Sequence, residues 1–134
     1  MDVKAFKMDG LGNDFVIIDR RKEDVSLSKE QIIKIGDRNN VGFDQIIFIE
    51  KKTNDAFPIK IFNPDGIEVG ACGNGSRCIA YLILKENNQR FIKLKAEKKI
   101  LEAEILSEKN VKINMGFPKF SEWYDIPLKN EKLN

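Results

Sequence analysis

The residues best suited to chemistry lie in a short segment, Cys72-Gly73-Asn74-Gly75, that precedes an apolar stretch. Its glycines predict a loop that turns into a helix, which places Cys72 at the helix N-terminus. Because unpaired backbone N–H groups and the helix dipole stabilise anions there, a thiol at this position would favour its reactive thiolate form. The same N–H groups could hold a ligand carboxylate. One short segment therefore offers a base and an anion-binding site.

A second interpretation of this segment stays open, in which Cys72 is a small buried hydrophobic residue and the glycines form a simple turn. Cys78 differs, because it adjoins the apolar run 79–85, and free cysteine is commonly buried. We predict that Cys78 belongs to the core. With two cysteines six positions apart, the sequence predicts neither a disulfide framework nor a CxxC redox or zinc motif.

The chain contains no histidine, which excludes a Ser-His or Cys-His nucleophile and most zinc sites within it. Proton transfer must therefore use thiol, carboxylate, amine or phenol groups. The glycines after Cys72 do not form a dinucleotide-binding fingerprint, because Cys78 occupies the third glycine position. The set Asn63, Asp65 and Glu68 lacks the spacing of a calcium loop, so we expect a turn beside the site.

Three amides, Asn13, Gln45 and Asn63, lie at predicted strand ends or loops, where they could orient a zwitterionic ligand by hydrogen bonds. Taken singly, each is more often an ordinary turn or surface residue. Charged residues near the glycine turns are expected to cap backbone groups or to form ion pairs instead of performing chemistry. These charged residues are Asp14, Asp44, Glu68 and Arg77.

The elements that must position these residues are mostly strands. Apolar and β-branched patterns predict strands at residues 3–8, 15–19, 45–50, 57–63, 91–96, 101–106 and 111–115, with turns at 9–13 and 63–66. Ser28 and Gln31 have the spacing of a capping box before a short helix that ends near Gly36. The run 79–85 is apolar nearly all round, so we expect a helix surrounded by protein. These elements predict an α+β fold with a curved, mainly antiparallel β-sheet wrapped around a buried central helix.

Length and charge indicate the number of domains and the partners and location that the protein can have. A chain of 134 residues can form a single core, and we expect one domain over 1–128 with a polar tail or interdomain linker at 129–134. The 23 basic and 21 acidic side chains are scattered, which argues against nucleic acid as a partner. Without a long apolar run or a signal-peptide core, we expect a cytoplasmic protein that does not bind membranes.

Three blocks of the sequence together resemble the diaminopimelate epimerase family. They read KMDGLGNDF at 7–15, RNNVGFDQ at 38–45 and FNPDGIEVGACGNGSRC at 62–78, and the similarity continues at 115–118 and 126–127. One departure is Asp9, which stands where many members carry histidine. The order and spacing of the blocks make the resemblance specific, and it spans nearly the whole chain.

The resemblance implies a two-domain isomerase that interconverts LL- and meso-diaminopimelate, in lysine and peptidoglycan biosynthesis, with the ligand between related halves. The family's first catalytic cysteine falls on Cys72. The resemblance places the substrate contacts on Asn13, Gln45, Asn63, Gly73 and Asn74. Since the family uses neither pyridoxal phosphate nor a metal, we expect no cofactor.

Epimerisation at a Cα atom needs a base on one face and an acid on the other, because a single base tends to return the proton to its original face. The family's second domain carries the second cysteine, and these 134 residues do not include it. We therefore expect a missing domain, a complementary chain or a second copy in a homodimer to supply it. A related amino-acid racemase and a noncatalytic binding or regulatory half-domain are the alternative functions.

Overall fold

The computed structural model describes residues 3–70, 72–108 and 110–116, which form a curved sheet and two helices. The predicted tail at 129–134, the boundary at 128 and the similar residues 117–118 and 126–127 lie outside the described residues. In chain order the elements are β1 Phe6–Gly10, β2 Asn13–Asp19, α1 Lys29–Gly36, β3 Gln45–Ile49, β4 Phe57–Phe62, β5 Glu68–Val69, α2 Gly73–Asn87, β6 Phe91–Ala96, β7 Lys99–Ser107 and β8 Asn110–Asn114.

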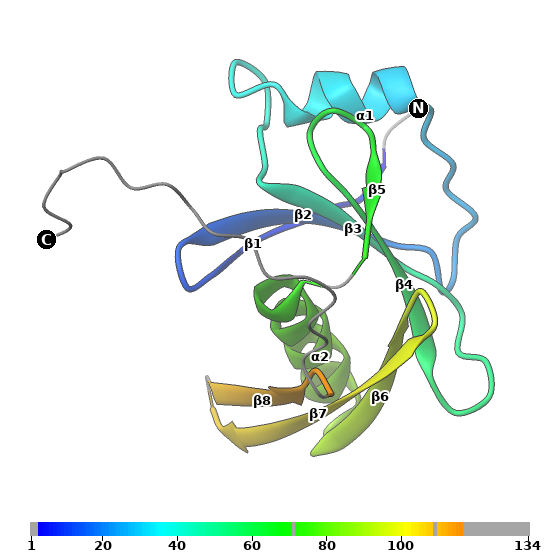
Figure 1. The fold of residues 1–134 in the computed structure, drawn as a ribbon, viewed down its shortest axis with the longest axis vertical. Helices are drawn as coiled ribbons and strands as arrows, with labels where there is room; N and C mark the ends of the chain where they lie inside the picture. Colours follow the sequence, from blue (N-terminus) through cyan, green and yellow to red (C-terminus); the bar gives the residue numbers. More distant parts are fainter. Residues whose placement is uncertain (1–2, 71, 109, 117–134) are drawn as a thin grey trace, which may run out of the picture.

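The strands join in the order β1-β2-β3-β4-β6-β7-β8, with β5 paired to β4. Most neighbours are antiparallel, which confirms the predicted sheet, but β2–β3 and β4–β6 are parallel. A parallel pair needs a crossover connection, and each helix supplies one: α1 lies between β2 and β3, and α2 lies between β4 and β6. Figure 1 shows α2 inside the hollow of the curved sheet and α1 outside it.

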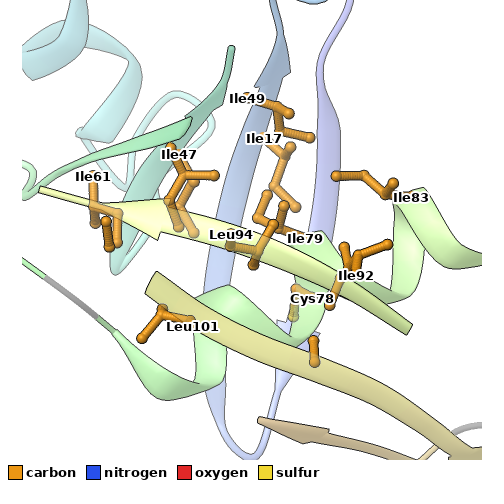
Figure 2. Packing of buried hydrophobic residues seen from close by; sticks show 14 of the residues in the cluster. Ile17, Ile47, Ile49, Ile61, Cys78, Ile79, Ile83, Ile92, Leu94 and Leu101 are labelled. Carbon is orange, nitrogen blue, oxygen red and sulfur yellow. The ribbon is translucent and has the colours of Figure 1, made fainter. Parts of the chain in front are cut away.

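The main core lies between α2 and the concave face of the sheet. Ile79 and Ile83 of the helix are fully buried, as the apolar run predicted. In Figure 2 the helical side chains meet isoleucines and leucines from the strands. The labelled strand residues are Ile17, Ile47, Ile49, Ile61, Ile92, Leu94 and Leu101. Burying this much apolar surface makes the largest favourable contribution to the stability of the fold.

A second core lies under α1 on the opposite face of β2 and β3. Val16 and Ile18 of β2 face this cluster, whereas Phe15 and Ile17 belong to the main core. Both faces of these strands are therefore buried, which explains why β2 and β3 read as continuous apolar runs instead of alternating ones. Ile32 is the most deeply buried side chain that α1 contributes to this cluster.

Local details concern the expected capping box, the first strand and the turn that follows it. The capping box of α1 is confirmed, since Gln31 N donates to the Ser28 hydroxyl and Ser28 N donates to the Gln31 amide. The predicted strand at 3–8 starts later and continues to Gly10, because a two-residue turn at Leu11 and Gly12, with φ of 50° and 90°, joins β1 to β2. Such a left-handed turn matches the twist of a hairpin, so a longer loop is unnecessary.

The remaining differences concern residues 63–87. Gly66 N donates to Asn63 O at 2.9 Å, which confirms the predicted turn, but Glu68 lies in the short strand β5 instead of in that turn. Helix α2 begins at Gly73, well before the apolar run, with Cys72 as its N-cap. Among the described residues, no helix is long and apolar enough to cross a membrane.

A glycine contact fixes where α2 meets the sheet, and it generates a stability prediction. A Cβ atom on Gly75 would lie 2.6 Å from Ile47 Cδ1 and 3.3 Å from Phe15 Cε1, both fully buried side chains. We expect Gly75→Ala to lower the free energy of unfolding by about 1 kcal/mol, because overpacking outweighs alanine's better helix propensity. Urea denaturation followed by circular dichroism measures the change.

Gly73→Ala is the matched control, because a Cβ there would meet Arg77 and Met115 atoms at ordinary distances of 3.8 and 4.0 Å. This variant should unfold at the urea concentration of the unmodified chain or slightly above it. Equal stability losses in the two variants would contradict the proposed contact.

Candidate active site

The thiol of Cys72 lies at the start of α2, as the sequence predicted. Cys72 has extended backbone angles, φ −129° and ψ 115°, and its Sγ accepts a hydrogen bond from Gly75 N at 3.5 Å. Its side chain packs against the main core yet remains partly exposed. Cys72 is therefore held against the helix without being fully buried, which disfavours the alternative of a buried structural cysteine.

Cys78 has the opposite environment. It is 6% exposed, belongs to the main core and faces the hairpin, where a Cβ on Gly10 would come within 3.0 Å of its Sγ. Burial raises the pKa of the Cys78 thiol, and the nearby charge of Arg77 opposes this effect to a smaller extent. The prediction that Cys78 is a core residue is confirmed.

The predicted amides come together at one end of the sheet. Asn13 and Gln45 are the first residues of β2 and β3, which run parallel, so their starts share an edge. Because β4 runs antiparallel to β3, its end returns to the same edge, where Asn63 follows. There Gln45 Nε2 donates to Asn63 Oδ1 at 3.3 Å. This arrangement explains how amides far apart in the sequence become neighbours.

The first turn of α2 reaches the same edge. Asn74 Nδ2 donates to Asn13 Oδ1 at 2.7 Å, and the Arg77 guanidinium donates to Asn74 Oδ1. Gly73 is the first helical residue, and a side chain there would meet nothing closer than ordinary contact. All six predicted site residues, Cys72 included, are partly exposed instead of fully buried.

Four charged residues form a cluster of ion pairs next to Asn13 and Gln45: Lys7, Asp14, Arg38 and Asp44. Arg38 donates two hydrogen bonds to the Asp14 carboxylate, at 2.5 and 2.8 Å, and a third to Asp44 at 3.0 Å. Lys7 Nζ also donates to Asp14, at 2.7 Å, and to the carbonyl of Gly42. The Arg38 guanidinium is the main cause that lowers the pKa of Asp14, with Lys7 adding to it.

The expectation that Asp14 and Asp44 form ion pairs is therefore confirmed, whereas Arg77 donates to an amide in place of a carboxylate. Sequence reasoning did not identify Lys7 and Arg38 as the partners. The one sequence feature that could have pointed to Lys7 and Arg38 is that each lies in a block that resembles the family. In the described part of the chain, no cluster of three His, Cys, Asp or Glu side chains is suited to hold a metal ion.

A cavity of about 600 Å³ lies beside the candidate site, lined by parts of β1, α2 and β8. Asn74 borders it, together with Arg77, Cys78 and the exposed Asp9, but Cys72 does not. The cavity therefore meets the site at Asn74 without enclosing the thiol.

Comparison with known proteins decides the family. The family model for diaminopimelate epimerase matches residues 5–121. The chain belongs to the diaminopimelate epimerase family. It is 49% identical over 131 residues to diaminopimelate epimerase of Pelagibacter ubique, a match that covers 98% of this chain and 47% of the relative. The corresponding protein of Acidiphilium cryptum is 43% identical, over 91% of this chain and 44% of its own length. The chain thus spans about half the length of the curated relatives it matches.

Solved structures support the same fold at lower identity. A phenazine biosynthesis PhzF family protein of Enterococcus faecalis is similar with a TM-score of 0.60 and 16% identity, over 78% of this chain and 41% of that structure. A hydroxyproline epimerase of Agrobacterium vitis is similar with a TM-score of 0.57 and 9% identity, over 81% of this chain and 40% of that structure. These likenesses confirm the α+β fold of a sheet curled around a helix.

The two cysteines should differ in reactivity because their burial differs. We expect a water-soluble alkylating reagent to modify Cys72 in the folded chain much faster than Cys78, since burial both limits access to the Cys78 thiol and raises its pKa. Mass spectrometry of time-resolved samples locates the label. Cys72→Ser should abolish fast labelling, and fast labelling that survives in this variant would refute the assignment.

The ion pairs of Asp14 predict an acid-sensitive stability. Its folded-state pKa lies below the ordinary 3.8, so this carboxylate stabilises the fold above that value and the contribution is lost as pH falls through and below it. We expect Asp14→Asn to show a shallower loss of unfolding free energy than the unmodified chain as the pH decreases from about 6 to about 3. Urea titrations at several pH values measure both slopes. Parallel slopes would show that Asp14 does not contribute.

Proposed function

We propose that this chain supplies one face of an amino-acid epimerase site, in which Cys72 exchanges the α-proton of one stereocentre of diaminopimelate. The observation that carries the proposal is the partly exposed Cys72 at the N-cap of α2, in a helix whose first turn holds Asn74 hydrogen-bonded to Asn13 of β2. Family membership adds the substrate class, because the matched relatives are named for diaminopimelate.

The surroundings of Cys72 suit a zwitterionic amino acid. Backbone N–H groups at the start of α2 would hold the α-carboxylate, and the helix dipole would favour its negative charge. The nearby amides, Asn13, Asn74, Gln45 and Asn63, offer both donors and acceptors for the remaining polar groups of the substrate. The same fixed dipoles would stabilise negative charge that develops at Cα when the proton leaves.

Inversion at Cα needs a second acid on the opposite face of the substrate. We infer that a second half, supplied by further sequence, a complementary chain or another copy, provides it, in agreement with relatives about twice as long as this match. The family uses two thiols for this exchange, and this chain offers Cys72 as one of them. The cytoplasmic location expected from the sequence stays a prediction.

An exchange experiment tests the role of Cys72. The chain is mixed with the part of the Pelagibacter ubique relative that the match does not cover, and LL-diaminopimelate in deuterated water is followed by proton NMR. We expect the α-proton signal to decay in the mixture. Cys72→Ser should slow this decay by a factor of about 100 or more, because a serine hydroxyl is a far weaker acid than a thiol and general base catalysis contributes at least that much.

Cys78→Ala is the control, since it removes a thiol that is buried in the core and leaves Cys72 in place. Its exchange rate should remain within a few fold of the unmodified pair. Unchanged exchange in Cys72→Ser would overturn the catalytic assignment. Faster exchange of another amino acid would indicate a related racemase, and substrate binding without exchange in every combination would indicate a binding module.

A further inference from the structure

A chain of hydrogen bonds in the candidate site has a charged group at each end. Asp44 Oδ2 accepts from Asn13 Nδ2 at 3.1 Å, and Asn13 Oδ1 accepts from Asn74 Nδ2 at 2.7 Å. At the other end, Asn74 Oδ1 accepts from the guanidinium of Arg77. The chain therefore runs from a carboxylate on the strand side, through two amides, to a cation on α2.

The charged ends give this chain a single direction. An ionised carboxylate can accept hydrogen bonds but not donate them, and a guanidinium can donate but not accept. If Asn13 turned its amide over, an oxygen would face Asp44 and an NH₂ group would face another NH₂ group. If Asn13 and Asn74 turned together, the central bond would survive, but both bonds to the charged ends would be lost. The observed orientation is therefore the one arrangement in which all three bonds form.

Asp44 is itself fixed at both carboxylate oxygens. Besides the bond from Asn13, Asp44 Oδ2 accepts a hydrogen bond from the backbone N–H of Asp14 at 3.0 Å. Asp44 Oδ1 accepts a hydrogen bond from Arg38 at 3.0 Å. The backbone N–H of Asp44 donates to Asp14 Oδ1 at 3.0 Å in return. Arg38 forms ion pairs with both neighbouring carboxylates, and Lys7 forms a further one with Asp14.

We infer that Asp44 and Arg77 are positioning residues that set the direction of the Asn13 and Asn74 amides before a ligand arrives. This inference rests on the proposed function, in which those amides contact the substrate, while Asp44 and Arg77 act through them. Each amide then presents its second N–H and its second lone pair in a predetermined direction. A preset array of this kind lowers the cost of ordering the site when the substrate binds.

The carboxylates of the charged cluster offer a matched pair of variants. Asp44→Asn replaces the acceptor at the end of the chain with an amide that can donate or accept, so the direction is no longer imposed. Asp14→Asn removes a carboxylate from the same cluster, but the Asp14 side chain makes no hydrogen bond to Asn13. A purely structural or electrostatic role of the cluster would affect the two variants alike.

The first measurement is independent of catalysis. Hydrogen exchange of the Asn13 and Asn74 side-chain NH₂ groups is followed by ¹⁵N NMR in the full chain, with Asn87, which donates to Ile83 O, as an internal reference. We expect Asp44→Asn to accelerate exchange at Asn13 and Asn74 several fold without changing Asn87. Asp14→Asn should change the exchange at Asn13 and Asn74 by less than twofold.

The second measurement uses the exchange assay of the mixed halves. We expect Asp44→Asn to lower kcat/KM for α-proton exchange at least tenfold, with Asp14→Asn within about threefold of the unmodified pair. Altered NMR protection in a mixture that never exchanges α-protons would support the positioning role and reject the proposed function. Equal effects of the two variants on NMR protection, or none in Asp44→Asn, would overturn the inference.

If Asp44→Asn does not fold, the opposite end of the chain gives the same test. Arg77→Gln replaces a group that only donates with one that does both, whereas Arg77→Lys retains a cation that only donates. We expect faster exchange of the Asn74 NH₂ group in Arg77→Gln and near-normal exchange in Arg77→Lys. Identical exchange in these two variants would contradict the role of charge in setting the direction.

Discussion

The close contact of Gly75 with Ile47 and Phe15 is the constraint on which the rest of the site depends. Without a Cβ atom at position 75, the first turn of α2 lies directly on the fully buried side chains of β2 and β3. Those strands begin with the residues whose amides reach the site, Asn13 and Gln45. This packing contact therefore fixes the first turn of α2, which follows Cys72 and carries Asn74, against strands β2 and β3.

Much of this arrangement follows from local sequence. The apolar run 79–85 predicted a buried helix, and the glycines after Cys72 predicted its start. The pattern over 91–96 predicted a strand, and in β6 the alternate residues Ile92 and Leu94 are buried. These features depend on residues close in sequence, for which periodicity and turn chemistry are sufficient.

The features that sequence did not predict are long-range. Lys7 and Arg38 are ordinary charged residues by composition, and their role arises because the β1–β2 hairpin brings Asp14 against the segment before β3. The parallel pairing of β2 with β3 likewise depends on the crossover through α1, which strand patterns do not specify. The family resemblance predicted which positions contact the substrate, and the structure shows hydrogen bonds that join Asn13 to Asn74 and Gln45 to Asn63.

The geometry of this half-site is made by contacts within the chain itself. Cys72 is held by Gly75, Asn74 by Asn13 and Arg77, and Asn63 by Gln45, all among the described residues. The helix that carries the thiol is enclosed by a core to which β1 and β8 also contribute. Positioning and chemistry therefore have different requirements. Contacts within the described residues orient Cys72 and the amides, whereas the proposed inversion at Cα would also need an acid on the opposite face of the substrate. Under the proposed function, a site preformed in this way would accept its second acid without any change in these contacts.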